Sequence, residues 1–325
     1  MSTASTSTAL WAISPGQAEL RSQPLPPPAK GQVRVRMRRS AISRGTESLV
    51  LHGKVPASEH DRMRGPHQEG HFPFPVKYGY MAVGIVEAGD PELNGRLVHC
   101  LHPHQDRFVV DRSAVVPVPA GVPERRAVLA ANMETALNGI WDAEVGPGDR
   151  VCVVGGGVVG CLVAWLAGRI PGTEVVLVDR LPRRAATAAA LGVGFAMPDA
   201  FPRDCDLVVH TSGSPAGLTT ALAAAGTEAT VLEMSWYGDR PVPAMLGEGF
   251  HSRRLLLRSS QVGRIPTRRA PRWDYSRRMQ TALKLLEDDQ LDAVLDGETP
   301  FSELPDKLAT ICAAPGVLCH SVVYP

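Results

Sequence analysis

Residues 151–168 read VCVVGGGVVGCLVAWLAG, an apolar run interrupted by glycines, and this stretch decides the fold. Eighteen uncharged residues are long enough for a membrane-spanning helix. Three of its five glycines are consecutive, at 155–157, and they would break such a helix. The run is therefore interpreted as a buried strand, a glycine turn and a buried helix.

The glycines at 155, 157 and 160 satisfy the pattern G-x-G-x-x-G, and their context makes it specific. An apolar strand precedes the pattern, an apolar helix follows it, and Asp179 closes the next strand nineteen residues after Gly160. In a nucleotide-binding turn, the first glycine permits the tight turn, the second lets a pyrophosphate approach, and the third packs helix on strand. The helix N-terminus supplies N–H groups for the phosphates. The alternative is a glycine turn in an α/β protein that binds no nucleotide.

The pattern predicts a dinucleotide cofactor, with NAD preferred to NADP. Asp179 would accept hydrogen bonds from the adenosine ribose and repel a 2′-phosphate. Arg180, Arg183 and Arg184 favour the opposite choice if they hold that phosphate, although arginines at a helix start are often only solvated. The residues expected to contact the cofactor are Gly155, Gly157, Val158, Val159, Gly160, Asp179, Arg180, Ser212 and Gly213.

Strands and helices alternate downstream of the turn, which is typical of a parallel sheet with helices on both faces. We expect strands at 151–155, 174–179, 206–211 and 228–234, and helices at 158–169, 182–191 and 215–225. The tail returns to a helix at 276–287, a short strand near 292–295, a helix at 302–313 and a last strand ending at Tyr324. The fold class is α/β, a Rossmann doubly wound parallel sheet beside a β-rich part.

The β-rich part is the first ~120 residues, where 32–38, 81–87 and 107–118 read as strands. Between them, residues 54–76 are rich in Pro, Gly, His and charge, which predicts a long surface loop and a candidate lid. Residues 123–143 read as a helix that leads into the alternating region.

The overall charge argues against nucleic-acid or membrane partners. There are 34 basic and 33 acidic side chains, so the net charge is close to zero and would not attract a polyanion. The N-terminal segment MSTASTSTALWAISPG has neither the basic nor the apolar region of a secretory signal. Six cysteines without a C-x-x-C pair fit reduced thiols, so we expect a cytoplasmic protein without disulfides that acts on a small molecule as a homodimer.

The chain resembles the medium-chain dehydrogenase/reductase superfamily of the alcohol dehydrogenase type in its whole order of parts. The resemblance rests on G-T-E after Arg44, YGYMAVGIV at 78–86, VGPGDRVCVVGGGVVG at 145–160 and a C-terminal segment that returns to the first domain. Within the superfamily it is similar to bacterial zinc-binding alcohol dehydrogenase and bacteriochlorophyllide-dehydrogenase-like proteins. It implies a GroES-like catalytic domain (1–126 and 265–325), a Rossmann domain (127–264) and a cleft where they meet.

The sequence departs from this family at the zinc. The catalytic ligand positions fall on Arg44, on Tyr80 with Met81, and near Glu134, of which only Glu134 is a ligand type. The four-cysteine lobe of the structural zinc is missing, so we expect no zinc. One other cluster, Cys100, His102 and His104, would share a face on a strand, but Pro103 disturbs that strand.

Four residues are candidates for the chemistry. Arg44 would either polarise a substrate oxygen where zinc is expected or fill the pocket in an ion pair with Glu134 or Glu47. The resemblance places Thr46 at the proton-relay hydroxyl. Tyr80 would act as general acid or base with a pKa lowered by a neighbouring cation, or would pack under the nicotinamide. Glu134 would be a base or the partner of Arg44.

An arginine-rich stretch follows the alternating region. Residues 251–278 hold nine arginines and one acidic residue, Asp274. Most of these arginines read as a solvated face or a subunit edge, and the sharper alternative is that a few favour an anionic substrate.

Three functions remain open at this stage. The first is a zinc-independent NAD(P)-dependent oxidoreductase acting on an alcohol/carbonyl pair. The second is an enoyl- or quinone-type C=C reductase, and the third is a nucleotide-binding sensor or partner protein without catalysis. Fold resemblance does not choose among them.

Overall fold

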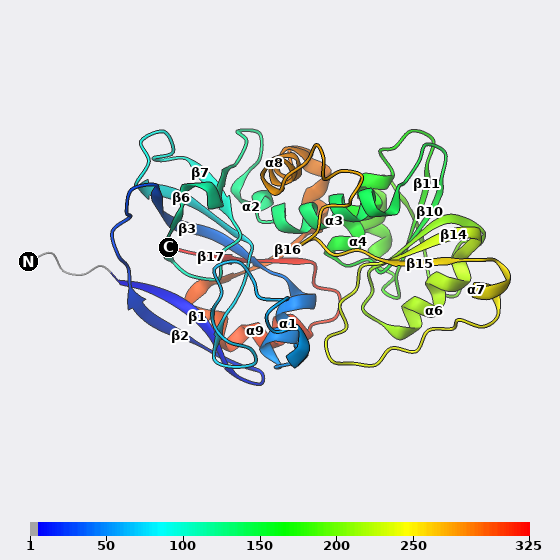
Figure 1. Ribbon diagram of the computed structural model, residues 1–325, viewed down its shortest axis with the longest axis horizontal. Coiled ribbons are helices and arrows are strands. Elements are labelled where there is room, and N and C mark those ends of the chain that lie inside the picture. The colour runs from blue at the N-terminus through cyan, green and yellow to red at the C-terminus, as the bar shows by residue number, and fades with distance from the viewer. Residues whose placement is uncertain (1–5) are drawn as a thin grey trace, which may run out of the picture. The chain divides into compact units, whose positions relative to one another are not determined.

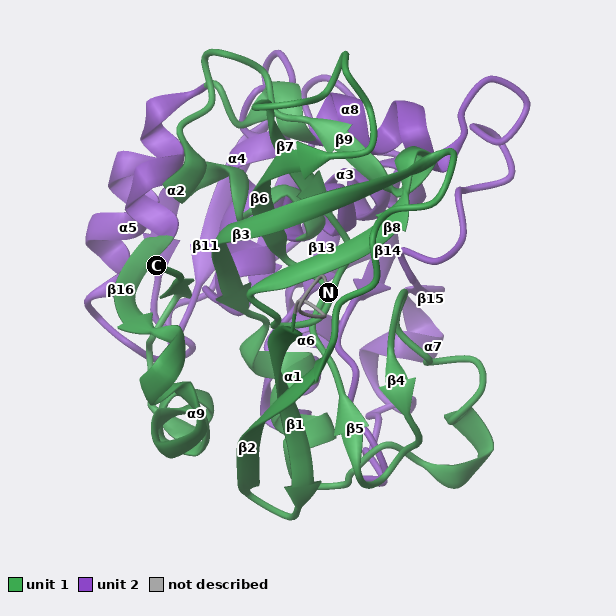
Figure 2. Ribbon diagram, turned by 90° about the vertical axis from the view of Figure 1, so that its left-hand side faces the viewer, with its two compact units in different colours: residues 1–131, 283–287, 295–325 green, residues 132–282, 288–294 purple. Residues whose placement is uncertain are grey.

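The computed structural model describes residues 6–325. Residues 1–5, at the start of the segment analysed for a secretory signal, lie outside the described part. The chain divides into two compact units (Figure 2). Unit 1 comprises residues 1–131, 283–287 and 295–325, and unit 2 comprises residues 132–282 and 288–294. The sequence placed 265–282 with the first domain, whereas in the structure these residues group with unit 2.

Unit 2 contains the predicted parallel sheet, whose six strands follow the order β12-β11-β10-β13-β14-β15. Strands β10, β11, β14 and β15 are labelled in Figure 1. The strands are β10 (Arg150–Val154), β11 (Glu174–Val178), β12 (Gly194–Ala196), β13 (Cys205–His210), β14 (Ala225–Glu233) and β15 (Leu256–Ser259). The helices between and around them are α3 (Ala130–Ala143), α4 (Val158–Ala167), α5 (Arg184–Ala190), α6 (Pro215–Ala224), α7 (Gly249–Ser252) and α8 (Tyr275–Leu285). The chain moves outward from β10 through β11 to β12 and then resumes on the other side of β10 with β13. The Rossmann prediction is thereby confirmed.

The glycine-rich stretch folds as the sequence predicts, as β10, a turn and α4. Residues Val151–Val154 of β10 are buried, and most of α4 is buried as well. Both elements are apolar on all sides, which is typical of an inner strand of a parallel sheet and of the helix that follows it. Gly155 has φ +115°, which suits glycine and no bulky residue. Among the described residues, no helix is both long and apolar enough to cross a membrane.

Unit 1 is rich in antiparallel strands, as expected. Its strands are β1 (Thr6–Ser14), β2 (Gln17–Pro24), β3 (Gln32–Ile42), β4 (Glu69–Gly70), β5 (Val76–Lys77), β6 (Ala82–Ala88), β7 (Leu97–Cys100), β8 (Arg107–Asp111), β9 (Val115–Pro117), β16 (Leu295–Pro300) and β17 (Cys319–Val323). They form a sheet in the order β2-β1-β5-β4 and another in the order β16-β17-β3-β6-β7-β9, with β8 paired to β3. The pairing of β17 with β3 joins the two ends of the chain in one sheet, so both ends build this unit.

The helices of unit 1 are α1 (Arg44–Leu51), α2 (Glu124–Ala127) and α9 (Leu304–Ala313). Two local expectations differ from the structure. The segment 54–76, expected as a surface loop, contains the short strands β4 and β5, which pair with each other, and β5 also pairs with β1. The strand expected near 292–295 begins at Leu295, after a 3-10 turn at Asp289–Val294. The strand through the histidine cluster ends at Cys100, before His102 and Pro103, in line with the expected effect of the proline.

Candidate active site and cofactor crevice

The crevice for a dinucleotide lies in unit 2, where the sheet changes direction between β10 and β13. In open α/β sheets, ligands bind outside the carboxyl ends of the strands at such a point. The turn after β10 packs tightly on the end of β13: a Cβ added to Gly155 would lie 2.6 Å from Ser212 N. The hydroxyl of Thr211 also donates to Gly155 O at 2.8 Å. Two of the predicted cofactor residues, Gly155 and Ser212, are therefore brought together at the crevice.

The geometry of the other two glycines of the pattern is compatible with their predicted roles. A Cβ on Gly160 would lie 1.9 Å from Gly155 O, so the helix packs on the turn only because this residue is glycine. Gly157 is exposed and precedes α4, and a Cβ there would meet no atom within 4 Å. Val158 and Val159 form the first turn of α4. The open space above Gly157 and the helix N-terminus fit a pyrophosphate.

Asp179 follows β11 at the same edge of the sheet. One carboxylate oxygen accepts from Gly156 N at 2.7 Å and the other from Leu181 N at 2.8 Å. Each oxygen retains a lone pair for a ribose hydroxyl. Arg180 is exposed, whereas Arg184 is buried and packs near Gly156. The donor set fits a dinucleotide, and Asp179 is the carboxylate that would face its adenosine ribose.

A hydrogen-bonded cluster at the same edge was not predicted from the sequence. His210 ends β13 with an exposed fraction of 0%, and it lies 2.6 Å from the hydroxyl of Ser212 and 2.7 Å from the carboxylate of Glu233. Tyr237 donates to the same carboxylate at 3.0 Å. Burial by itself would raise the pKa of Glu233, but the hydrogen bonds and charge of its neighbours, His210 first, hold it below its ordinary value. The available signal was a histidine and a glutamate ending adjacent parallel strands.

In unit 1, two predicted catalytic residues come together. The phenol of Tyr80 donates to the hydroxyl of Ser43 and also hydrogen bonds with Thr46. Burial raises the pKa of Tyr80, although both hydroxyls oppose this effect. This direction corrects the expectation that a neighbouring cation lowers it, because desolvation of the phenol dominates. The arrangement holds a neutral phenol in a row of hydroxyl groups.

Arg44 begins α1, and its guanidinium donates to the backbone carbonyls of Val317 and Cys312. Cys312 lies in the last turn of α9, where a cation interacts favourably with the helix dipole. Glu47, a predicted partner of Arg44, accepts from Ser43 N at 2.8 Å and lies 3.0 Å from His104 Nε2. These contacts favour a structural role for Arg44, and its catalytic role stays a prediction.

Glu134 belongs to α3 in unit 2, where it meets Arg278 of α8. The guanidinium of Arg278 lies 3.0 Å from the carboxylate of Glu134 and donates to Asn138 and to Val262 O. Both members of this pair are buried, and Arg278 is 2% exposed. Arg278 is therefore an exception to the prediction that most arginines of the stretch lie on a solvated face. Burial raises the pKa of Glu134, with Arg278 opposing.

The family resemblance predicts zinc-ligand positions at Arg44 and Tyr80. Arg44 is a permanent cation and Tyr80 is a protonated phenol, so neither binds a metal in these states. The alternative cluster is also engaged elsewhere: His102 stacks on Phe108 at 3.7 Å, and His104 contacts Ser40 and Glu47. Within residues 6–325, no group of three or more histidine, cysteine or acidic side chains has metal-site geometry. We therefore derive no step through a metal.

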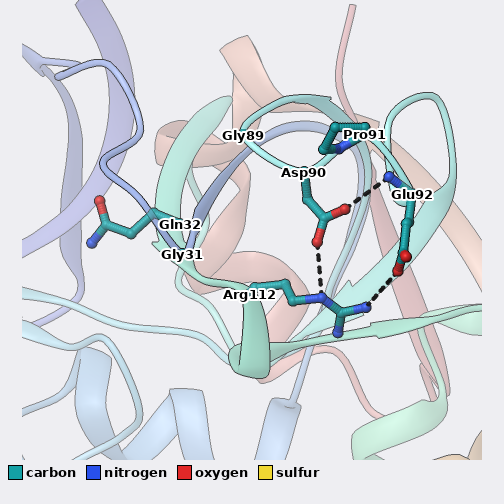
Figure 3. A pocket seen from close by; sticks show the side chains of 7 residues that line it. All are labelled: Gly31, Gln32, Gly89, Asp90, Pro91, Glu92 and Arg112. Carbon is teal, nitrogen blue, oxygen red and sulfur yellow. Dashed lines mark hydrogen bonds and ion pairs between the residues drawn. The ribbon is translucent and has the colours of Figure 1, made fainter.

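A surface hollow of about 520 Å³ lies in unit 1 (Figure 3). Its lining includes an ion-paired cluster in which Asp90 accepts from Arg112 at 2.9 Å, and Arg112 also lies 3.8 Å from Glu92. The lining residues are Gly31, Gln32, Gly89, Asp90, Pro91, Glu92 and Arg112. None of them is a predicted site residue, and Arg112 is shared between the two carboxylates.

Comparison with known proteins agrees with the geometry. No protein-family model matches the chain. D-guloside 3-dehydrogenase of Escherichia coli K12 is 24% identical over 306 residues, covering 85% of this chain and 87% of that protein. The uncharacterized zinc-type alcohol dehydrogenase-like protein YphC of the same organism is 27% identical over 166 residues, covering 47% of each.

Among solved structures, a putative zinc-binding dehydrogenase from Sinorhizobium meliloti 1021 bound to NADP superposes with a TM-score of 0.79 at 18% identity, covering 98% of this chain and 99% of that one. The TM-score establishes a shared fold, and at this low identity it establishes nothing more. The similarity in sequence comes from the curated relatives. Together with the glycine fingerprint, the Rossmann sheet and the unit built from both chain ends, these comparisons show that the chain shares its fold with a zinc-binding-type dehydrogenase and is similar in sequence to a sugar dehydrogenase and to a zinc-type alcohol dehydrogenase-like protein.

Proposed function

We propose that the protein is an NAD(P)-dependent oxidoreductase that transfers hydride between the nicotinamide and an alcohol/carbonyl substrate without zinc. The observation that carries this proposal is the crevice between β10 and β13, where an open glycine turn, a helix N-terminus and Asp179 fit a dinucleotide. The relative that covers most of the chain is a dehydrogenase of D-guloside, which favours a secondary hydroxyl of a sugar-like substrate. Asp179 favours NAD, while a structural neighbour bound to NADP keeps NADP open.

The bound nicotinamide would supply the hydride chemistry, and the chain has to manage a proton. Thr46, Tyr80 and Ser43 form a hydrogen-bonded row of three hydroxyl groups in unit 1. Because the pKa of Tyr80 is raised, the phenol stays protonated, and its single proton would turn from Ser43 to a developing alkoxide. In this proposal Thr46 and Tyr80 hold and move the proton. Arg44 and Glu134 have structural roles, Arg44 through its hydrogen bonds to backbone carbonyls and Glu134 through its ion pair with Arg278.

Two properties of the working protein belong to the same proposal. The six cysteines are buried as free thiols, which fits the reducing cytoplasm. The parallel sheet ends at β15, whose residues Leu256 and Leu257 are exposed, and this edge suits a second copy of the chain. We propose a cytoplasmic homodimer.

The decisive experiment follows nicotinamide absorbance with purified, untagged protein on a panel of polyols, glycosides and simple secondary alcohols, with enones included. Oxidation of a polyol or glycoside with NAD supports the proposal. Activity on enones alone would indicate a C=C reductase, and tight cofactor binding without turnover on any compound would indicate a sensor. Elemental analysis of the same sample tests whether the protein works without zinc, and one zinc per chain would contradict this part of the proposal.

The proton-relay assignment has its own test. Tyr80→Phe should lower turnover by about 10²-fold, as the loss of one preorganised donor typically does, while dinucleotide affinity stays unchanged. Tyr275→Phe is the matched control, because Tyr275 is an exposed tyrosine whose hydroxyl donates to Gly263 O. Equal turnover in the two variants would remove Tyr80 from the mechanism.

A further inference from the structure

The cluster around His210 has a fixed pattern of donors and acceptors. The carboxylate of Glu233 receives three contacts: from His210 Nδ1 at 2.7 Å, from Tyr237 at 3.0 Å and from Ser235 N at 2.7 Å. An ionised carboxylate only accepts hydrogen bonds, so the Nδ1 atom of His210 must carry a proton. The other nitrogen, Nε2, is then an acceptor whenever the imidazole is neutral.

This tautomer sets the direction of the next hydrogen bond. Ser212 lies 2.6 Å from His210 Nε2, so its hydroxyl donates inward to the neutral imidazole. Its oxygen also accepts a weak bond from Ser214 N at 3.3 Å. A hydroxyl oxygen has two lone pairs, so one lone pair of Ser212 remains and can accept from a ligand.

The position of this hydroxyl is built by the surrounding backbone. Ser212 is exposed, whereas His210 beneath it is fully buried. A Cβ added to Gly217, in the first turn of α6, would lie 2.0 Å from Ser212 Oγ and 2.7 Å from His210 Nε2. Only glycine at 217 leaves room for the bond between Ser212 and His210. Gly155 packs on the backbone of Ser212 from the other side, so the hydroxyl belongs to the wall of the crevice.

We infer that His210 is a positioning residue that holds Ser212 as a hydrogen-bond acceptor for a ribose hydroxyl of the dinucleotide, and that dinucleotide binding is therefore linked to the loss of a proton from His210. The inference rests on the proposed function and adds a proton-linked element to its cofactor site. Ribose hydroxyls are the donors that a dinucleotide presents beside its phosphates, and a phosphate oxygen could not use an acceptor.

The proton linkage follows from what a second proton on His210 would do. With both ring nitrogens protonated, Nε2 donates to Ser212 and occupies its remaining lone pair, so the acceptor facing the crevice is lost. The described charged and titratable groups around this imidazole are Glu233, Tyr237 and Arg240; Arg240 lies 6.0 Å over the Tyr237 ring and donates to Gly213 O at 3.2 Å.

The experiment is calorimetric titration with NADH between pH 8 and 5.5, the range that spans ordinary histidine titration. At pH 6 it is repeated in two buffers of different ionisation enthalpy to count protons. The native protein should bind NADH roughly three- to tenfold more weakly at pH 5.5 than at pH 8, the equivalent of one net hydrogen bond, and should release a fraction of a proton on binding at pH 6.

Two variants test the route through Ser212, and both leave every titratable group in place. Ser212→Ala and Gly217→Ala should bind NADH roughly three- to tenfold more weakly at pH 8, lose the extra weakening at pH 5.5, and release no proton. Ser212→Ala should melt close to the native protein because Ser212 is exposed, whereas Gly217→Ala should melt at a lower temperature because its Cβ would lie 2.7 Å from Nε2 of the buried His210. Thr219→Ala removes a hydroxyl from the exposed side of α6 and should behave as the native protein does.

The outcomes separate the inference from the proposed function. If Ser212→Ala keeps the native affinity, pH profile and proton release, the inference is overturned while the dehydrogenase proposal stands. If the native protein binds neither NADH nor NADPH at any pH, the proposed function fails and the inference fails with it.

Discussion

At the scale of single residues, burial and the nearest partner decide what a charged side chain does. From the sequence, Arg44 is a candidate catalytic residue, and Arg278 belongs to a stretch whose arginines are mostly expected on a solvated face. In the structure, Arg44 donates to the carbonyl of Cys312 in the last turn of α9 and to that of Val317 beyond the helix, and Arg278 is 2% exposed beside Glu134. A buried guanidinium needs such partners because an unpaired buried charge is very costly.

Replacement of Arg44 should reveal which role it has. We expect Arg44→Met to lower the free energy of unfolding by about 1–3 kcal/mol, because it leaves the carbonyls of Cys312 and Val317 without their charged donor. Turnover per folded molecule should stay near the native value. Denaturant unfolding and active-site-normalised kinetics measure the two, with Arg62→Met as the exposed control. A 10²-fold loss of turnover at native stability would instead make Arg44 a catalytic cation.

His99 should make the protein sensitive to acid. It is 1% exposed on β7, and burial lowers its pKa to about 4. The unfolded chain therefore binds a proton at a higher pH than the native chain, so this contribution to stability is complete above about pH 6.5 and is lost as the pH falls towards 4. The expected loss is on the order of 3 kcal/mol across that window.

Urea unfolding at pH 7, 5.5 and 4.5 measures this effect. The variant His99→Leu should show a shallower decline with pH than the native protein, whatever its stability at pH 7. His52→Leu is the control, since His52 is an exposed histidine on the same unit. Parallel pH profiles for native protein and His99→Leu would show that His99 is not the source of the acid sensitivity.

At the scale of elements, the turn between β10 and α4 uses its glycines for different purposes. Gly160→Ala should destabilise unit 2, because its Cβ would lie 1.9 Å from Gly155 O and 2.6 Å from Thr211 Oγ1. Gly157→Ala should melt with the native protein, because its Cβ would meet no atom within 4 Å. It should nevertheless bind NADH at least tenfold more weakly, because that space is where the pyrophosphate approaches.

Thermal melting and calorimetric titration on the two variants test this contrast. Each variant is the control for the other, since both add one methyl group to the same turn. Native affinity in Gly157→Ala would place the phosphates elsewhere, and native stability in Gly160→Ala would show that the helix can move away from the turn.

At the scale of the whole molecule, the sheet of unit 2 ends at an apolar edge. Leu256 is 53% exposed on β15, the last strand in the order. Exposed apolar edge strands pair with other chains. Leu256→Glu should therefore convert the proposed homodimer into a monomer, whereas Leu246→Glu, at an exposed residue outside the strands, should leave it intact. Sedimentation velocity measures the mass, and a native dimer that persists in Leu256→Glu would place the interface elsewhere.

The sequence by itself determined the α/β class, the glycine turn and the succession of strands and helices in unit 2. These features depend on patterns within a few residues of the chain. Examples are the apolar periodicity, the positive φ of Gly155, and the close approach of Gly160 to the carbonyl of Gly155, which leaves no room for a side chain. The meeting of Gly155 and Ser212 also followed from the alternation, because parallel strands bring their carboxyl ends to one edge.

Only the tertiary structure decided the partners of the polar side chains. Arg278 finds Glu134 across 144 residues, and Arg44 finds Cys312 across 268. His210 and Glu233 meet because β13 and β14 are neighbours in register, with His210 directly opposite Glu233. Hydrogen bonds and desolvation act over a few ångströms, so the state of such a side chain depends on atoms that the folded chain brings near it and not on its neighbours in the sequence.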